Sequence, residues 1–328
     1  MDLLSKIKQA KLVGRGGACF SVAKKWSAVK NAAGEKKYVV ANAAEGEPGV
    51  LKDGYILEHH ADRVIDGMKL AIDFFKAEKG YLYLNHAYAK KLNKKLALLI
   101  KGLPIEIFIK PIGAGYIGGE ESAVLNAITG KRIEPRLKPP FPVTSGLWDS
   151  PTLVNNVETF YNVSLVNSGE YKNNRFYTIT GDCPNEGVYE LPDNLTIAQV
   201  LKKTKNYPKF SFFVQVGGNA AGEVLNSKQL KCEVCGAASV AVFSLAKNNF
   251  KTTVKNWLNF YSNESCGQCT ACREGVYRLR EAWLAEKTDW PLVNELLDNL
   301  SDASFCALGS GLTIPIKSLI SNVYPQKK

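Results

Sequence analysis

Histidine is scarce in this sequence, and long hydrophobic runs are absent from it. Only three of the 328 residues are histidines, so few ligands of this type are available to a metal. The longest mostly apolar run, 237–246, is far shorter than the span of about 20 residues that a membrane helix needs. The N-terminal segment, MDLLSKIKQAKLVG, lacks the apolar stretch of a secretory signal. We therefore expect a soluble, cytoplasmic protein.

The charge pattern argues against a nucleic-acid-binding protein. The net charge is +11. A hydrophobic content of 45% is typical of a globular chain, and 328 residues are enough for two or three domains. Lysines are spread from end to end, and no segment pairs them with regularly spaced aromatic residues, as a nucleic-acid surface would. A solvated, lysine-rich surface is the interpretation we favour.

The eight cysteines constrain the function most. Thiols of cytosolic proteins stay reduced, so a cysteine cluster indicates metal binding or catalysis before disulfides. Three lie in SNESCGQCTACREG, as Cys266, Cys269 and Cys272, and a fourth, Cys306, follows in SFCALGSG. Zinc usually takes its ligands as two separated pairs, whereas three closely spaced cysteines and a distant fourth are typical of a 4Fe–4S cluster. The alternative is four buried cysteines that align by chance.

The segment before Cys306 indicates how the fourth thiol returns to the triplet. Residues 276–300 have apolar positions at helical spacing, with a break at 288–291. This pattern predicts a helical hairpin, whose turn would bring Cys306 back to the other three cysteines.

The remaining cysteines give a weaker signal. Cys232 and Cys235 form an isolated C-x2-C pair, and no histidine lies near them in the sequence. Two packed structural thiols are the favoured interpretation. Half of a metal site completed by a partner, or a redox pair, are the alternatives. Cys183 looks like a thiol in a loop, and the sequence assigns no role to Cys19.

The N-terminal half alternates strands with helices, which predicts a parallel sheet in an α/β domain. Strands are expected at 38–41, in GYLYLN and in IEIFIK, and helices near 64–77 and 87–100. Three polar residues follow the first strand, namely Asn42, Glu45 and Glu47. Ligand-binding residues typically follow the carboxyl ends of such strands.

Two glycine-rich loops accompany this sheet. GRGGACF, at 14–20, follows a short helix, and Arg15 and Lys25 place positive charge near it. PIGAGYIGGEES, at 111–122, follows the third strand and contains Glu120 and Glu121. Glycines let the backbone approach phosphate or a flat ring closely, so the loops favour a nucleotide-like ligand. Further along, 175–243 is rich in strands and turns, and the chain is helical from Phe250 onward.

Six motifs, in order, resemble the flavin-bearing, NADH-oxidising subunit of respiratory complex I and the related diaphorase subunits of NAD-linked hydrogenases and formate dehydrogenases. They are GRGGACFSVAKKW, NAAEGEPG, GAGYIGGEESAVLNAITGKRIEPRLKPPFP, PTLVNNVET, ESCGQCTACREG and FCALG. The resemblance covers nearly the whole chain. It implies a Rossmann-like FMN and NADH domain at 1–168, a β-grasp-like, soluble-ligand-binding domain at 169–248, and a helical bundle with the 4Fe–4S cluster at 249–328.

The resemblance also implies the residues of each site. FMN would be held by Gly14, Arg15, Gly16, Gly17, Lys25, Asn42, Glu45, Gly119, Glu120, Asn155, Asn156 and Thr159. NADH would stack on the flavin beside Phe20, Glu47, Glu121, Lys138 and Phe141. The cluster would be bound by Cys266, Cys269, Cys272 and Cys306. Carboxylates near the ribose would repel a 2′-phosphate and so favour NADH over NADPH.

The implied activity is that of an NADH dehydrogenase, or diaphorase. A hydride passes from NADH to FMN, and single electrons pass to the 4Fe–4S cluster and on to partner subunits. No side chain needs to act as a general acid or base. The implied partners are a small iron–sulfur subunit of thioredoxin-like fold and a larger iron–sulfur or hydrogenase subunit, with no nucleic acid. The expected location is cytoplasmic, free or peripheral to a membrane complex.

The chain departs from the usual family pattern at the flavin site. Cys19 replaces the last glycine of GRGGAGF, FSVA at 20–23 replaces FPTG, Ala44 replaces an acidic residue, and Ala28 replaces a larger side chain that can cover the adenine. A Cβ at Cys19 or Ala23 is expected to open the loop slightly, and the loss of an adenine-stacking partner at Ala28 is expected to weaken NADH binding. Two alternatives therefore stay open: a degenerate relay or structural subunit that keeps only the cluster, and an interaction protein whose cysteines bind zinc.

Overall fold

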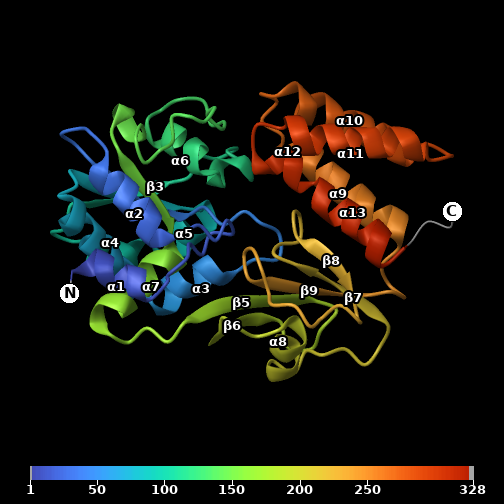
Figure 1. Cartoon of the computed structure of the whole chain (residues 1–328), viewed down its shortest axis with the longest axis horizontal. Helices are drawn as coiled ribbons and strands as arrows, with labels where there is room; N and C mark the ends of the chain where they lie inside the picture. Colours follow the sequence, from blue (N-terminus) through green and yellow to red (C-terminus); the bar gives the residue numbers. More distant parts are fainter. Residues whose placement is uncertain (1, 325–328) are drawn as a thin grey trace. The chain divides into compact units, whose positions relative to one another are not determined.

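A computed structural model describes residues 2–324 of the chain, which form two compact units (Figure 1). The first unit contains the described residues up to Gly46 together with Leu51–Phe176. The second unit contains Glu47–Val50 together with the described residues from Tyr177 onward. A short segment of the N-terminal half thus belongs to the second unit.

The first unit is built on a parallel sheet with the strand order β3-β2-β1-β4. Its strands are β1 (Tyr38–Ala43), β2 (Lys79–Leu84), β3 (Ile105–Ile109) and β4 (Thr152–Asn156). β1 and β2 are almost wholly buried, because they are continuous apolar runs in a sheet that is covered on both faces. The three predicted strands are confirmed, and β4 is an additional one. The strand order reverses between β1 and β4, where open α/β sheets typically have their ligand crevice.

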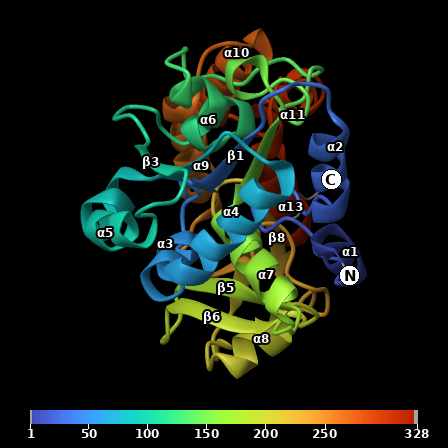
Figure 2. The ribbon, with the colours of Figure 1, turned by 90° about the vertical axis from the view of Figure 1, so that its left-hand side faces the viewer.

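Helices cover both faces of this sheet (Figure 1). They are α1 (Leu3–Gln9), α2 (Val22–Asn31), α3 (Lys52–His59), α4 (Ala61–Phe75), α5 (His86–Leu99), α6 (Glu121–Ile128) and α7 (Val157–Ser168), with 3-10 turns η1 (Ile117–Gly119) and η2 (Leu147–Asp149). α4 and α7 lie side by side (Figure 2). They approach closely at Gly67, where an added Cβ would overlap the Phe160 carbonyl oxygen. The helices expected near 64–77 and 87–100 correspond to α4 and α5.

The second unit begins with a mixed sheet in the order β6-β5-β9-β7-β8. Its strands are β5 (Asn174–Gly181), β6 (Gly187–Pro192), β7 (Phe212–Val216), β8 (Glu223–Asn226) and β9 (Ser239–Ser244). β5 and β9 are parallel, and β7 is antiparallel to both of its neighbours. The helix α8 (Ile197–Lys203) buries its apolar side chains in the same core as the sheet. One helix packed on a mixed sheet is the β-grasp-like arrangement that was expected.

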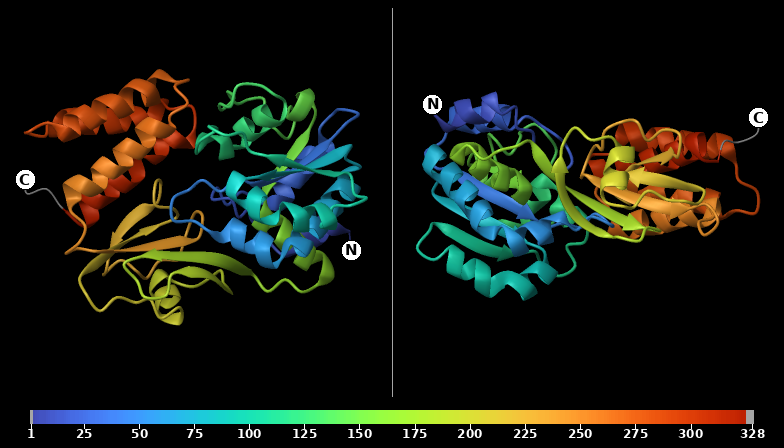
Figure 3. Two further views of the ribbon diagram at one scale, coloured as in Figure 1. Left: turned by 180° about the vertical axis from the view of Figure 1, so that it is seen from behind. Right: turned by 90° about the horizontal axis from the view of Figure 1, so that it is seen from below.

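A helical bundle completes the second unit (Figure 3, orange to red). Its helices are α9 (Phe250–Glu264), α10 (Thr270–Leu284), α11 (Trp290–Ala303), α12 (Ala307–Gly311) and α13 (Thr313–Asn322). α10 and α11 form the predicted hairpin, and Asp289 caps α11 by accepting the N–H of Leu292. α13 packs against β8, which joins the bundle to the sheet. Within residues 2–324, no helix combines the length and apolarity that a membrane crossing requires.

Candidate functional site

Polar groups predicted for the flavin site gather at the carboxyl edge of the parallel sheet. Asn42 and Asn156 are paired in register near the ends of β1 and β4. The Asn156 side chain donates to the Asn42 carbonyl at 3.3 Å, and the Asn42 side chain donates to the Gly119 carbonyl at 2.9 Å. These contacts tie both strand ends to the second glycine loop, at the crevice that the strand order predicts.

The first glycine loop lies against the same edge. The backbone N–H of Arg15 donates to Thr159 Oγ1 at 3.0 Å, and Thr159 lies in the first turn of α7. An added Cβ at Gly16 would stand 3.3 Å from the Asn156 Cβ, and Gly17 has a φ of +109° with open space beside it. Glycine at these positions lets the backbone pass close over the end of β4 and face open space. The cradle therefore fits a flat ring or a phosphate.

The two basic residues near this loop point in different directions. Arg15 is 1% exposed, and its guanidinium donates to the Tyr171 hydroxyl at 3.4 Å, so its charge faces the interior of the first unit. Lys25, on α2, lies 2.5 Å from the Glu121 carboxylate and donates to the Val154 carbonyl at 2.7 Å. Lys25 thus brings its charge to the end of β4, paired with a carboxylate predicted for the NADH pocket.

Glu120 anchors the second glycine loop. Its carboxylate accepts the backbone N–H groups of Ser122 and Ala123, at 2.8 and 2.9 Å, and so caps α6. The Lys138 ammonium lies 2.7 Å away. Burial opposes the charged form, but hydrogen bonds from Lys138 and Ser122 hold the pKa of Glu120 below its usual value. Glu120 is therefore ionised at neutral pH and fixes both the loop and Lys138.

The other predicted residues of the first unit differ in exposure. Phe20 and Phe141 are 57% and 53% exposed, so both rings are accessible to a ligand. Gly14 closes the first loop, because its N–H donates to the Phe20 carbonyl at 2.8 Å. The Asn155 side chain faces the interior. When its amide is oriented with the oxygen toward Trp26, this oxygen accepts the indole N–H of Trp26 at 3.2 Å. The structure therefore does not bring the Asn155 side chain to the glycine loops.

The structure also contains a buried charge cluster beneath this edge, which the sequence analysis did not predict. Lys52, in the first turn of α3, is 2% exposed and lies 2.6 Å from Asp53 and 3.1 Å from Glu158. Lys52 also donates to the Asn156 side chain at 3.0 Å, and Asn156 donates to Asp53 at 2.8 Å. The cluster thus holds the Asn156 side chain in one orientation. Its sequence signal is only a Pro–Gly turn followed by Lys–Asp, which ordinarily indicates a solvated helix start.

Glu45 extends this cluster toward the loops. It accepts the backbone N–H of Asp53 at 3.0 Å and the Tyr88 hydroxyl. Burial, reinforced by the Asp53 charge, raises the pKa of Glu45 to about 7. Burial also opposes the charge on Lys52, but the carboxylates of Asp53 and Glu158 raise the pKa of Lys52 above its usual value. Glu45, which is predicted for the flavin site, therefore changes its charge near neutral pH, whereas Lys52 beside it stays charged.

Glu47 belongs to the second unit, where backbone amides bind it. The N–H groups of Ala220 and Ala221 donate to its carboxylate at 2.8 and 3.3 Å. Both residues lie in the loop between β7 and β8, and an added Cβ at Gly218 would overlap the carboxylate. The loop therefore forms a small anion-binding turn around Glu47. The role of Glu47 in NADH binding stays a prediction.

The predicted cluster cysteines lie together at one end of the helical bundle. Cys266 and Cys269 precede the first turn of α10, Cys272 lies within it, and Cys306 is the residue before α12. Cys269 and Cys272 are buried, while Cys266 and Cys306 are partly exposed. An added Cβ at Gly309, in α12, would stand 3.1 Å from the Cys272 Cβ. The hairpin thus returns the fourth cysteine to the triplet.

The four thiols also influence one another electrostatically. Burial raises the pKa of Cys272 to about 11, against a hydrogen bond with Ser265. The charges of the other three cysteines raise it further, so each of them lies within electrostatic range of Cys272. Thiols in this setting ionise when a metal supplies positive charge, and four cysteines are the usual donor set of a 4Fe–4S cluster. The donor set therefore fits the cluster.

Within the described part of the chain, no three histidine, cysteine, aspartate or glutamate side chains are grouped so as to hold one metal ion. The preference for a 4Fe–4S cluster over zinc rests on the donor set itself, which is three closely spaced cysteines and a distant fourth.

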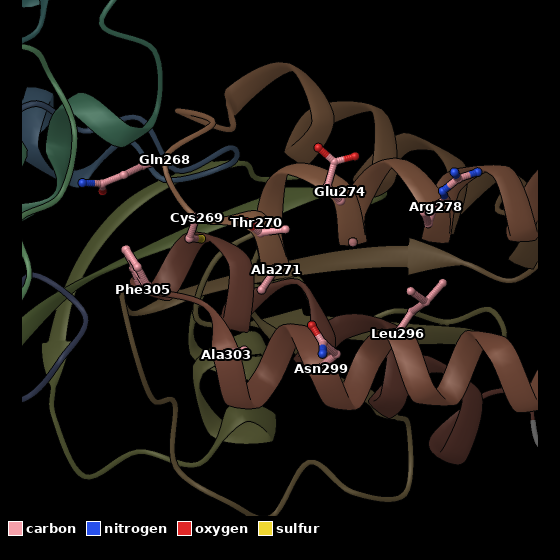
Figure 4. A pocket seen from close by; sticks show the side chains of 11 residues that line it. Gln268, Cys269, Thr270, Ala271, Glu274, Arg278, Leu296, Asn299, Ala303 and Phe305 are labelled. Atoms are coloured by element: carbon pink, nitrogen blue, oxygen red, sulfur yellow. The ribbon is translucent and has the colours of Figure 1, made fainter.

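A pocket of about 560 Å³ opens beside these cysteines, between α10 and α11 (Figure 4). Cys269 and Phe305 lie at one end of this pocket, and Glu274 and Arg278 line it further along α10. Cys269, although buried, therefore borders an open surface of the second unit.

Two predictions about individual residues are wrong. Cys232 and Cys235 are not packed thiols: both are exposed, because Val234 between them is the side chain that enters the core. Ala23 does not open the first loop, because it lies within α2, where a Cβ is readily accommodated. Cys19, in contrast, has a φ of +51°, a conformation in which a Cβ is strained.

The fold and the sites together define a flavin-type α/β unit on a chain that also carries an iron–sulfur bundle, and known proteins share both parts. The family described as the Nuo51 FMN-binding domain matches residues 7–165, and that described as the NADH-ubiquinone oxidoreductase-F iron-sulfur binding region matches 252–326. The NADH-quinone oxidoreductase-F subunit of Streptomyces coelicolor is 32% identical, over 97% of this chain and 80% of the relative. The corresponding Escherichia coli protein is 31% identical, over 97% and 82%.

Among solved structures, a chain of an NAD+-reducing NiFe hydrogenase in the H2-reduced state superimposes with a TM-score of 0.89 at 29% identity. The match covers 98% of this chain and 61% of that chain, so this chain spans less than two thirds of the hydrogenase chain. This chain belongs to the NADH-quinone oxidoreductase-F family, NADH-oxidising subunits of larger enzymes with an FMN domain and a 4Fe–4S region. The predicted family, fold class, enzyme class and cofactors are thereby confirmed.

Proposed function

We propose that this chain is the electron-input subunit of a larger enzyme of the complex I or NAD-linked hydrogenase type. Bound FMN would accept a hydride from NADH and pass electrons singly to the 4Fe–4S cluster. The observation that carries the proposal is the convergence of two glycine loops and the ends of β1 and β4 at one edge of the parallel sheet. The proposal keeps three domains: FMN and NADH at 1–168, β-grasp-like at 169–248, and the cluster bundle at 249–328.

In this proposal the chain's own residues bind and orient. Gly16 and Gly17 would face the flavin, and Thr159 holds their loop by accepting the Arg15 N–H. Asn42 and Asn156 would border the ring with side chains that are already fixed by hydrogen bonds, so little entropy is lost on binding. The exposed rings of Phe20 and Phe141 would contact NADH, with the charges of Lys138 and Glu121 beside it.

The partners we propose are the two that the resemblance implies. A small iron–sulfur subunit of thioredoxin-like fold and a larger iron–sulfur or hydrogenase subunit would take the electrons. The pocket beside Cys269 supports this step, because it exposes the surroundings of a cluster ligand at the surface. Part of the basic surface, which gives the chain its net charge of +11, would serve such contacts. The proposed location is the cytoplasm, free or peripheral to a membrane complex.

Anaerobic titration of the purified chain with NADH tests the proposal. We expect visible bands of both flavin and iron–sulfur, bleaching of the flavin band by NADH, and an EPR signal from the reduced cluster. NADPH at the same concentration should bleach the flavin more slowly. If FMN is bound but stays oxidised in millimolar NADH, the chain is a relay subunit. If no flavin binds on reconstitution, the assignment of the crevice is wrong.

A further inference from the structure

Two serine hydroxyls lie beside Cys272, one of the buried cluster cysteines. The first belongs to Ser265, whose Oγ is 3.4 Å from the Cys272 sulfur. The same oxygen accepts the backbone N–H of Gly267 at 3.3 Å. Because the oxygen acts as the acceptor toward Gly267, its own proton is available to the sulfur. Ser265 is therefore placed to donate to Cys272.

The second hydroxyl belongs to Ser304, two residues before Cys306. Its oxygen is buried and has no hydrogen-bond partner among residues 2–324. An added Cβ at Gly309 would overlap the Ser304 hydroxyl and would stand 3.1 Å from the Cys272 Cβ. The Ser304 hydroxyl, Gly309 and Cys272 thus share one small volume, and only glycine at 309 leaves room for the hydroxyl.

A buried hydroxyl without an acceptor costs about 1–3 kcal/mol, so a chain that keeps one usually has an acceptor for it in the functional state. Thiolate and sulfide sulfurs of an iron–sulfur cluster are such acceptors. A hydrogen bond to one of them withdraws electron density and stabilises the reduced cluster, which raises the reduction potential.

We propose that Ser265 and Ser304 donate hydrogen bonds to the sulfurs at the Cys272 side of the 4Fe–4S cluster and raise its reduction potential. The inference rests on the proposed function, since it requires a cluster at the four cysteines. Both serines are positioning and tuning residues: they bind no substrate, and neither is a ligand. Their effect is to make the cluster a better acceptor of single electrons than its four thiolates alone would make it.

The test is an EPR-monitored redox titration of the intact chain with its cluster. Ser265→Ala and Ser304→Ala should each shift the midpoint to a more negative potential at unchanged iron content, and the double variant should shift it further than either. Alanine is smaller than serine, so both substitutions fit the site. Ser265→Thr keeps the hydroxyl and should restore the original midpoint. Ser301→Ala, on an exposed part of α11, is the matched control and should leave it unchanged.

The outcomes separate this inference from the proposed function. Absence of any cluster signal in the unsubstituted chain would refute the proposed function. A normal signal with the same midpoint in the two alanine variants would refute the inference alone. If an alanine variant loses its cluster, pulsed EPR of the unsubstituted chain decides. Transfer into D2O should remove proton couplings to the cluster that arise from the two hydroxyls, and the absence of exchangeable protons coupled to the cluster would overturn the inference.

Discussion

The flavin crevice and the cysteine site are built in opposite ways. The crevice takes one or two residues from each of several distant segments, and its contacts are mostly between backbone groups and side-chain amides. The cysteine site takes three of its four side chains from one seven-residue stretch, and only thiols can serve there. Single changes should therefore weaken the crevice gradually, whereas they should abolish the cysteine site.

The polar groups around the two sites also differ. Beneath the crevice lies a buried cation, Lys52, surrounded by carboxylates and held at 2.6 Å from Asp53. Beside the cysteines lie neutral hydroxyls of Ser265 and Ser304. Charges that are paired inside a protein are costly to disturb, while hydroxyls tune a neighbour without a large effect on folding. The four predictions below test this contrast, beginning with the largest effect.

Cys269→Ala should remove the 4Fe–4S cluster entirely. An alanine at this position offers no thiolate, and a 4Fe–4S cluster needs all four cysteine ligands. We expect no cluster EPR signal and a large loss of bound iron, while the FMN content stays near that of the unsubstituted chain because the first unit has its own core. Cys183→Ala, just after β5, is the control. An unchanged EPR signal in Cys269→Ala would reject the ligand assignment.

Lys52→Met should destabilise the first unit by about 3–5 kcal/mol, because it leaves the Asp53 and Glu158 carboxylates buried without their cation. The measurement is the midpoint of thermal or urea unfolding. Lys36→Met removes an exposed ion pair with Glu78 and should cost less than about 1 kcal/mol. Adding Asp53→Asn to Lys52→Met should recover part of the loss. Equal effects of Lys52→Met and Lys36→Met would show that the buried cluster contributes no special stability.

The sequence predicted those features that depend on residue type at a fixed spacing. Thiols at 266, 269, 272 and 306 have few other uses in a reduced protein, and apolar runs such as 38–41 have few other structures. The Lys52 cluster was missed because local sequence does not show that a lysine is buried; the fold alone brings Glu158 to it. Cys232 and Cys235 were misjudged for the same reason, since Val234 takes the place in the core.

The sequence also did not predict the directions of the Asn155 and Asn156 side chains. Consecutive strand residues point to opposite faces, so the side chains of Asn155 and Asn156 differ in direction. The structure directs Asn156 toward Asn42 and Asn155 toward Trp26. Motif resemblance named both residues, and only the register of β4 with β1 distinguishes them.

Glu45→Gln should flatten the pH dependence of stability in the flavin-free chain. The folded-state pKa of Glu45 is raised from 4.5 to about 7 by burial and by Asp53, with Lys52 and Tyr88 beside it. The folded state therefore holds the proton more tightly, and this contribution is complete below pH 4.5 and lost as the pH rises through about 7. The unsubstituted chain should melt at a falling temperature between pH 5 and 8. Glu45→Gln should melt with a smaller decline, and a parallel decline would contradict the assignment. The exposed Glu78→Gln is the control.

Cys19→Gly should tighten FMN binding by a factor of about two to five. A residue with a Cβ in the left-handed conformation costs about 1–2 kcal/mol, and Cys19 has a φ of +51°. Glycine loses more chain entropy on ordering, about 0.5–1 kcal/mol, so a net gain of about 0.5–1 kcal/mol remains for the ordered loop. Fluorescence titration with FMN measures it. Cys19→Ala keeps the Cβ and should bind FMN like the unsubstituted chain, which separates backbone strain from thiol chemistry. Ala18→Gly, beside it but without positive φ, should give no gain. Equal affinities of Cys19→Gly and Cys19→Ala would show that the backbone strain at this position does not contribute to the free energy of FMN binding.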